Sequence, residues 1–488
     1  MSDEAWLGLD LGTQSARALA VSPRGEVLAA AARPLRSRRD GPRHEQDPEG
    51  WWTALAGAAR EALDGLGAEV RGLATCGTSG TICLLDAAGR PLTPGLMYDD
   101  ARAGGELTDA VNEAGAEVWD RLGYRMQPSW ALPKLAWLAG EGAFEAGARV
   151  AHQVDVVTSR LLGEPAAADT SNALKTGYDL LEERWPADVL DALGIAPAVL
   201  PGVVRAGARL GEVCADAAEA TGVPAGTPVI AGMTDSCAAQ LAAGALREGD
   251  WNSVLGTTLA LKGVTGELVR DPLGVVYSHR APDGGWLPGG ASSVGAGVLA
   301  REFEGRDLAA LDRAASEHEP AGAVAYPLVS RGERFPFTAP EAEAFMLGEP
   351  AGEADRYAAV LQGVAHVERL CLDYLDLLGA PVDGELSLTG GATRSAYWCQ
   401  LRADVLGRPV RLPAEAEAAL GMAVLAAAHG RTTAEAAAEM VRVRAVLEPR
   451  ADRTERFREP YVRLVEALGE RGWIGERVVE HARARAAA

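Results

Sequence analysis

The sequence predicts an α/β protein of two related domains that turn phosphate-binding loops toward a shared cleft. Two hairpin-like stretches support this prediction, Leu7–Arg17 near the start and Ser253–Leu261 in the second half. In each, an apolar run reaches a Gly-Thr turn followed by a hydroxyl or amide side chain, and a second apolar run begins. Strands alternate with helices around both hairpins, and 488 residues leave room for two or three domains.

The two Gly-Thr turns suit a phosphate because glycine lets the backbone approach an anion closely. Asp10 lies at the tip of the first strand, where its carboxylate is placed to hold a metal ion. A single Asp-x-Gly-Thr is more often an ordinary turn. The presence of one such turn in each half is therefore what indicates phosphate binding.

The first half reads as hairpins followed by alternating strands and helices. Asp47 is a suitable N-cap and Pro48 suits the first helical position, so an Ala-rich amphipathic helix is expected to begin there. The other expected elements are strands at 25–28, 70–76, 81–86 and 229–232, a largely helical region over 104–225, and a helix over 236–245. A boundary near 244–251 then gives domains of residues 1–246 and 247–488.

The second half repeats this scheme. The expected elements are a hairpin near 253–264, helices near 292–302, 354–379 and 395–406, and a strand at 385–389. The tail at 481–488 is expected to fray.

Charge and composition exclude several classes of protein. A net charge of −21 argues against nucleic acid or an anionic membrane as a partner. The acidic start leads directly into a strand, so no signal peptide is expected, and no apolar run approaches the roughly 18 residues of a membrane span. The six cysteines show no paired or metal-like spacing, which is typical of a reduced, cytoplasmic protein.

The lysines exclude one mode of nucleotide binding. The chain has only Lys134, Lys175 and Lys262, and none follows a Gly-x-x-x-x-Gly stretch, so a P-loop is absent from the sequence. Any anionic ligand must then be held by a metal ion, helix ends and backbone amides.

Asp235 is the candidate general base. It follows a short strand and stands where a helix begins, so a helix N-cap is the alternative interpretation. Gly232 permits close approach of the backbone, and small residues line the start of the helix. A carboxylate in this position can accept a hydroxyl proton while the helix N-terminus stabilises nearby phosphate.

Further stretches suit a nucleotide or a polyhydroxyl ligand. Gly390–Ser395 follows a strand and opens a helix, which makes either an anion-binding corner or a tight turn. Gly289–Gly295 offers a small-residue surface for a purine or ribose, and Gly77–Thr81 places hydroxyls at a strand end. Asp100 and Arg102 form either a ligand site or a structural pair.

Several of these motifs occur together in one known family. They are Asp10–Thr13, Gly232–Asp235, Gly256–Thr258, Gly390–Gly391 and the helix Ser395–Asp404. In this order, they make residues 6–430 resemble the FGGY carbohydrate kinases. The resemblance implies two ribonuclease-H-like domains of the actin and hexokinase superfold, with mixed β-sheets flanked by helices and an active site in the interdomain cleft.

The resemblance also implies ATP and Mg²⁺ as ligands and assigns roles to individual residues. Asp235 corresponds to the general base, and Asp10 and Asp235 to the metal site. The sugar contacts are Asp10, Ser79, Asp100 and Asp235, and the nucleotide contacts are Thr13, Gln14, Gly256, Thr257, Gly295, Gly390, Gly391 and Ser395. Phosphoryl transfer needs mostly positioning and charge neutralisation, which these groups supply.

The expected acceptor is the terminal hydroxyl of a free ketopentose. Gly77–Thr81 and Asn172–Tyr178 resemble the D-ribulose kinase branch, which makes D-ribulose the main expectation. Glu45–Trp52 resembles xylulose kinases instead, so D-xylulose is the alternative. Cys76 stands where the D-ribulose branch usually has Asp, which leaves the substrate open. A non-catalytic, actin-like sensor is a further alternative, although Asp10 and Asp235 are both intact. A homodimer is compatible with the sequence.

Overall fold

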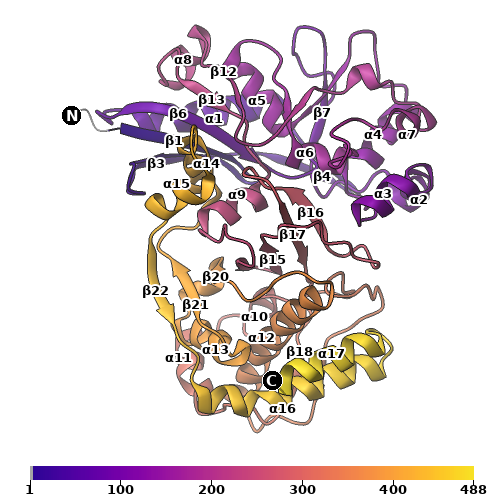
Figure 1. The fold of residues 1–488 in the computed structure, drawn as a ribbon, viewed down its shortest axis with the longest axis vertical. Helices are drawn as coiled ribbons and strands as arrows, with labels where there is room; N and C mark the ends of the chain where they lie inside the picture. Colours follow the sequence, from indigo (N-terminus) through magenta and orange to yellow (C-terminus); the bar gives the residue numbers. More distant parts are fainter. Residues whose placement is uncertain (1–3, 488) are drawn as a thin grey trace. The chain divides into compact units, whose positions relative to one another are not determined.

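Both predicted hairpins lie in mixed β-sheets that are flanked by helices (Figure 1). The structure is a computed structural model that describes residues 4–487. It divides into two compact units, which confirms the predicted fold class. The first unit contains the chain up to Gly244 together with His279–Trp286 and Glu415–Arg442, and the second contains Ala245–Ser278, Leu287–Ala414 and Val443 onward. The split into residues 1–246 and 247–488 stays a prediction for the two family domains.

The first unit is built on a six-stranded sheet in which the N-terminal hairpin is central. Strand β1 pairs antiparallel with β2 and parallel with β6, so that Asp10 lies opposite Arg17 on one side and Cys76 on the other. In spatial order the strands are β12 (Arg209–Glu212), β13 (Pro228–Ile230), β6 (Glu69–Gly77), β1 (Glu4–Leu11), β2 (Ser15–Val21) and β3 (Val27–Pro34).

A smaller sheet and several short helices complete the first unit. Its five strands, in spatial order, are β4 (Ser37–Asp40), β5 (Arg43–Gln46), β8 (Gly95–Leu96), β7 (Ile82–Leu85) and β9 (Arg149–His152), and β10 (Ala168–Asp169) pairs separately with β11 (Val203–Val204). The helices are α1 (Pro48–Leu63), α2 (Gly104–Ala114), α3 (Ala116–Leu122), α4 (Ala131–Gly140), α5 (Gln153–Leu162), α6 (Thr170–Ala173), α7 (Ala187–Ala192), α8 (Ala215–Thr221), α9 (Asp235–Ala242), α14 (Ala418–Ala427) and α15 (Thr433–Met440). The region 104–225 is thus less helical than predicted, because short strands and turns interrupt it.

Helix α1 begins as the sequence predicts. Asp47 is extended and its side chain accepts a hydrogen bond from the Glu49 N–H, and Pro48 occupies the first turn, where no N–H is needed. The apolar face of α1, including Trp51 and Leu55, is buried in the core that also contains Leu7 and Leu9 of β1.

The return of the chain to the first unit through α14 covers the face of β1. A Cβ added at Gly8 would lie 1.7 Å from the Ala419 carbonyl oxygen, and one added at Gly421 would lie 1.9 Å from the Ala238 carbonyl oxygen. Helix α14 therefore packs against both β1 and α9 through direct backbone contacts at these glycines. Figure 1 shows the orange α14 beside the indigo β1.

The other large sheet has seven strands, most of whose residues belong to the second unit, which also contains the long buried helix α12 (Glu353–Leu377). The strands, in spatial order, are β16 (Tyr277–Arg280), β17 (Trp286–Ala291), β15 (Leu259–Gly263), β14 (Trp251–Leu255), β20 (Leu386–Thr389), β21 (Val410–Pro413) and β22 (Val443–Leu447), with β18 (Val324–Tyr326) paired to β19 (Phe345–Leu347). The helices are α10 (Gly297–Glu302), α11 (Leu308–Ala315), α12 (Glu353–Leu377), α13 (Ala396–Leu406), α16 (Ala451–Glu470) and α17 (Glu476–Ala487).

The C-terminal tail is ordered, which corrects the expectation that residues 481 onward fray. Residues 481–487 belong to α17, where Ala482 and Ala486 are buried and Arg485 Nε donates to Asp373 Oδ1 at 2.7 Å. Residue 488 lies outside the described residues. Within the described chain, no helix combines the length and apolarity that crossing a membrane would need.

Candidate active site

Asp10 and Asp235 lie at neighbouring strand ends of the first unit. Asp10 is the penultimate residue of β1 and is only 7% exposed. Thr234 forms a parallel bridge with Gly77, which brings the start of α9 beside the end of β6, the strand next to β1. Burial and, after it, the negative charge of Asp235 raise the pKa of Asp10 to about 6. The two carboxylates are therefore close enough to repel each other electrostatically.

Asp235 is not the N-cap of α9, and its role as a general base stays a prediction. Thr234, not Asp235, occupies the N-cap position of α9, and its side chain makes no capping hydrogen bond. Asp235 is the first helical residue, and its Oδ1 accepts a hydrogen bond of 2.7 Å from the Ser236 N–H. A partly exposed carboxylate on the positive end of a helix is the arrangement expected of a base working near phosphate.

Close backbone packing places Asp235. A Cβ added at Gly232 would lie 1.8 Å from the Thr75 carbonyl oxygen, so the segment leading to Asp235 lies flush against β6. This contact is the close approach expected of Gly232 from the sequence. On its other side, α9 packs against Gly421 of α14.

The loop Gly77–Thr81 is fixed by buried polar side chains. The Thr78 N–H and its hydroxyl both donate to Gln153 Oε1, at 2.9 and 2.8 Å. Lys134 Nζ donates to the carbonyl oxygens of Gly80 and Met97, at 2.6 and 2.8 Å. These contacts fix the backbone that carries Ser79.

Ser79 itself presents an unused hydroxyl. Its Oγ is buried and has no hydrogen-bond partner within residues 4–487. Its carbonyl oxygen accepts a long bond, 3.4 Å, from Lys175 Nζ. A buried hydroxyl without a partner costs free energy unless a ligand or water meets it, and a sugar contact by Ser79 stays a prediction.

Asp100 is engaged in a structural network. It is fully buried and accepts hydrogen bonds from the His44 N–H and from the N–H, Nε and Nη2 of Arg102. Burial alone would raise the pKa of Asp100, but the hydrogen bonds from Arg102 and His44 hold it below its ordinary value. Arg102 also pairs with Glu45 at 2.7 Å. The structural Asp–Arg pair is therefore present, and a sugar contact by Asp100 stays a prediction.

The turn of the first hairpin presents Thr13 and Gln14. Its backbone is held from the side, because Gln46 Nε2 donates to the Thr13 carbonyl oxygen at 2.6 Å and the Leu35 N–H donates to the Gln14 carbonyl oxygen at 2.8 Å. The Gln14 side chain is exposed. Hydrogen bonds thus hold the backbone of the turn, and the exposed Gln14 side chain can contact a ligand.

The second unit holds the matching turn, formed by Gly256 and Thr257. Thr257 is exposed, and the carbonyl oxygens of Gly256 and Thr257 accept from the N–H groups of Ala296 and Gly297 at 2.9 and 3.0 Å. A Cβ at Gly295 would lie 2.3 Å from the Thr257 carbonyl oxygen. Gly295 therefore supports the turn by close packing.

The Gly390–Ser395 corner follows β20 as predicted. Gly390 has φ of +87°, and a Cβ there would lie 2.6 Å from the Leu255 carbonyl oxygen, so both conformation and packing require glycine. Gly391 is exposed. Ser395 caps α13 by accepting from the Trp398 N–H and donates to Asp312 Oδ2 at 2.7 Å. Ser395 thus has a structural task at this corner.

The residues of the first unit suit a magnesium ion. The described chain contains no group of three or more His, Cys, Asp or Glu side chains that could hold a metal. Mg²⁺ commonly uses one or two carboxylates and completes its shell with water and substrate phosphates. Asp10, with a buried carboxylate whose pKa is raised partly by Asp235, fits that requirement.

Several residues that shape the site were missed from the sequence. Lys134, Gln153 and Ser171 act through buried hydrogen bonds to backbone that is distant in sequence. The scarcity of lysine was the available signal, since two of only three lysines contact the Gly77–Thr81 loop. Glu333 is buried and accepts four hydrogen bonds.

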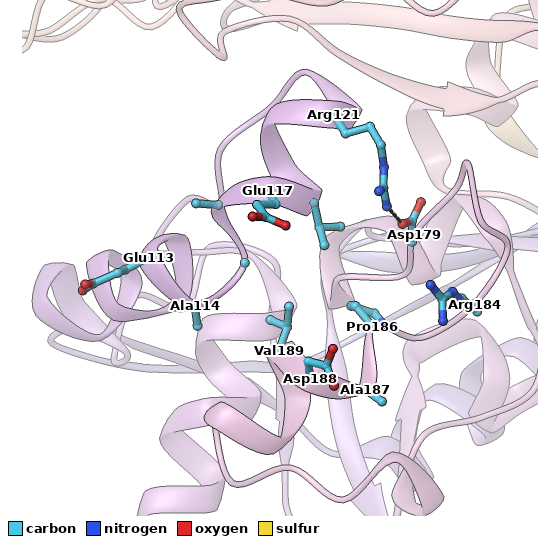
Figure 2. A pocket seen from close by; sticks show the side chains of 13 residues that line it. Glu113, Ala114, Glu117, Arg121, Asp179, Arg184, Pro186, Ala187, Asp188 and Val189 are labelled. Carbon is cyan, nitrogen blue, oxygen red and sulfur yellow. Dashed lines mark hydrogen bonds and ion pairs between the residues drawn. The ribbon is translucent and has the colours of Figure 1, made fainter.

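A separate pocket of about 590 Å³ lies in the first unit, away from these residues. Figure 2 shows the ion pair of Arg121 with Asp179 at one side, and Glu117 and Asp188 nearby. None of the predicted site residues lines it, and its charges are of both signs. It therefore does not enter the assignment of function.

Comparisons with known proteins match most of the chain. Models of the FGGY family of carbohydrate kinases match residues 5–242 with the N-terminal domain and 251–429 with the C-terminal domain. A xylulose kinase of Streptomyces coelicolor is 32% identical over 453 residues, which cover 89% of this chain and 90% of that protein. One of Streptomyces rubiginosus is 30% identical over 483 residues, covering 96% and 97%. The crystal structure of xylulose kinase from Rhodospirillum rubrum superimposes with a TM-score of 0.84 at 28% identity, covering 95% of this chain and 98% of that one.

Proposed function

The chain belongs to the FGGY family of carbohydrate kinases, and from this premise we propose that it phosphorylates the terminal hydroxyl of D-xylulose with ATP. That it is an ATP-dependent carbohydrate kinase follows from the family. The observation that carries the choice of sugar is the match to xylulose kinases along nearly their full length. The segment Glu45–Trp52 supports the same choice.

In the proposed reaction, Asp235 accepts the proton of the attacking sugar hydroxyl. Its fixed position at the start of α9 and its partial exposure support this role. The oxygen freed of its proton then attacks the γ-phosphorus, and the bond to the ADP oxygen breaks. Ser79 Oγ offers a buried hydrogen bond to a sugar hydroxyl, and we assign sugar contacts to Asp10 and Asp100 as well.

We assign the nucleotide to two sets of residues. Thr13, Gln14, Gly256 and Thr257 would meet the phosphates with backbone N–H groups and polar side chains. Gly390, Gly391 and Ser395, with Gly295 behind the turn, would form the adenosine corner. Asp10 and Asp235 would hold Mg²⁺, which neutralises phosphate charge when bound.

D-Ribulose is the second candidate, because Gly77–Thr81 resembles the D-ribulose kinase branch. The relatives favour D-xylulose over this main expectation from the sequence. The two sugars differ in the direction of one hydroxyl, so a few hydrogen bonds decide between them, each worth about 1–3 kcal/mol if its loss leaves a buried group unpaired. The cytoplasmic location and the homodimer stay predictions.

The test is sugar-dependent ADP release from ATP and Mg²⁺, measured over a panel of D- and L-ketopentoses, polyols and glycerol and ranked by kcat/KM. We expect D-xylulose to rank first. A D-ribulose preference would show that the Gly77–Thr81 loop and not the overall likeness sets specificity. ATP binding without activity on any sugar would favour the sensor. The Asp235→Asn protein, purified in parallel, controls for contaminating kinases.

A further inference from the structure

A buried hydrogen-bond chain leads from Asp169 to the residue that precedes Asp235. Ser171 Oγ donates to Asp169 Oδ1 at 2.5 Å and accepts a bond of 2.9 Å from the Thr234 N–H. Ser171 and Thr234 are fully buried, and Asp169 is nearly so. The chain thus connects the turn after β10 with the start of α9, across 63 residues of sequence.

Asp169 fixes the direction of the Ser171 hydroxyl. Its Oδ1 also accepts from the N–H groups of Ser171 and Asn172, at 2.8 and 3.0 Å, and its Oδ2 accepts from Asn172 Nδ2 at 2.6 Å. Because the Asp169 carboxylate accepts the hydrogen bond of the Ser171 hydroxyl, a lone pair of the Ser171 oxygen faces the Thr234 N–H. The acceptor offered to Thr234 is therefore held in one orientation.

The Thr234 peptide is held at both ends. Its N–H is bound by Ser171, and its carbonyl oxygen accepts from the N–H groups of Cys237 and Ala238, at 3.0 and 2.9 Å. Thr234 does not use its own side chain as a cap. Besides the packing of Gly232 on Thr75, the Ser171 hydroxyl is therefore the side-chain group that binds the backbone directly before Asp235.

We propose that Ser171, oriented by Asp169, is a positioning residue that sets where the Asp235 carboxylate meets the sugar hydroxyl. This inference rests on the proposed function, since it assigns the task of Ser171 to the base of that reaction. Ser171 does not touch the ligand in this role. Its loss frees the start of α9 and moves Asp235 away from its reacting geometry while leaving the binding groups Ser79, Thr257 and Gly391 in place.

The experiment compares Ser171→Ala with Ser159→Ala and Ser171→Thr. Ser159 is a matched control because its Oγ also accepts a backbone N–H bond, from Ala166 at 2.9 Å, in α5 of the same unit. We expect Ser171→Ala to lower kcat by about tenfold or more, because small misplacements of reacting groups can cost about a hundredfold. KM for ATP and the calorimetric Kd for D-xylulose should change little. Ser171→Thr, which keeps the hydroxyl, should recover most of kcat.

The outcomes separate this inference from the proposed function. A wild-type enzyme that turns over none of the sugars contradicts the proposed function. An active wild type whose Ser171→Ala variant keeps the kcat of Ser159→Ala contradicts the positioning role alone, as does a loss confined to the Kd for D-xylulose. Thermal unfolding of each variant reports its folding. If Ser171→Ala does not fold, Asp169→Asn replaces it, because it removes the charge that orients the hydroxyl, and the same kcat loss is expected.

Discussion

At the scale of single residues, the candidate site depends on a few side chains whose surroundings alter their ordinary behaviour. Asp10 is buried beside Asp235, and both factors raise its pKa to about 6. Burial raises the pKa of the Cys76 thiol, so Cys76 stays protonated and its Sγ can donate to Asp10 Oδ1, at 3.5 Å. Cys76 is thus a neutral hydrogen-bond donor beside Asp10, at the position where the D-ribulose kinase branch usually has the charged residue Asp.

The role of Asp235 predicts a large effect of removing its charge. Asp235→Asn should lower kcat by about 10²–10⁴-fold, the usual contribution of a general base, while KM for the sugar changes little. Steady-state ADP release at saturating ATP measures this. Asp216→Asn is the matched control, because Asp216 is an exposed acidic residue in the first turn of α8. Near-normal turnover of Asp235→Asn would contradict the assignment.

Lys134 predicts a pH dependence of stability. Burial lowers the pKa of Lys134 from its ordinary 10.5 to about 7 in the folded protein. Between these values the unfolded chain binds the proton and the folded protein does not, so the free energy of unfolding rises with pH across this window. The rise should be ~1 kcal/mol per pH unit in its middle. The neutral amine still has the N–H groups that Gly80 and Met97 accept.

The measurement compares the wild type with Lys134→Met by urea unfolding at several pH values between neutral and pH ~9. The stability difference, wild type minus variant, should increase with pH, because only the wild type carries this proton. A difference that is constant or decreases with pH would show that Lys134 is charged in the folded protein. Lys262→Met is the control, since Lys262 lies in the second unit.

At the scale of elements, both phosphate-type turns are held by segments from elsewhere in their own unit. Glu333 is the clearest case in the second unit. Its carboxylate accepts from the Ser293 N–H at 2.6 Å and from Ser292 Oγ at 2.9 Å. The segment then continues to Ala296, whose N–H binds the Gly256 carbonyl oxygen. Glu333 therefore supports the Gly256–Thr257 turn through this connecting segment.

Glu333→Gln should raise KM for ATP several-fold while KM for the sugar stays the same, because one charged acceptor is replaced by a donor beside Ser293. Initial rates at varied ATP and saturating sugar measure this. Asp271→Asn is a matched control, since Asp271 is a buried carboxylate of the same unit that also accepts backbone N–H groups and a tyrosine hydroxyl. Equal changes in both variants would indicate a general loss of stability instead.

At the scale of the whole molecule, the chain returns to its first unit after building most of the second. Residues 415–442 bring α14 onto β1 and α9, where backbone meets backbone at Gly8 and Gly421. The elements that carry Asp10 and Asp235 are therefore completed by a helix near the end of the chain. The compact first unit therefore includes this late segment of the sequence.

Gly8→Ala tests this packing. The added Cβ would lie 1.7 Å from the Ala419 carbonyl oxygen, and backbone cannot move aside as a side chain can. We expect a loss of about 3 kcal/mol or more in the free energy of unfolding, measured by urea denaturation. Gly72→Ala is the control in a neighbouring strand, where the nearest atom to a new Cβ is 3.7 Å away. Equal stability of the two variants would contradict close packing of α14 on β1.

The sequence by itself determined the local features of this protein. The hairpin turns, the N-cap at Asp47 and the strand before Asp235 are set by neighbours within a few residues, so the fold class and the FGGY family could be predicted. The places of Asp10, Asp235 and the Gly-Thr turns on the chain followed from the same motifs.

Only the tertiary structure decided which distant groups hold those residues in place. Lys134, Ser171 and Glu333 each bind backbone that lies tens of residues away in sequence. Helix α14 comes from the second half of the sequence but belongs to the unit that the first half builds. The tail was expected to fray because it is terminal, yet Arg485 donates to Asp373 and two alanines are buried. Such contacts depend on how the whole chain folds in space, and a local sequence pattern does not determine which distant residues meet.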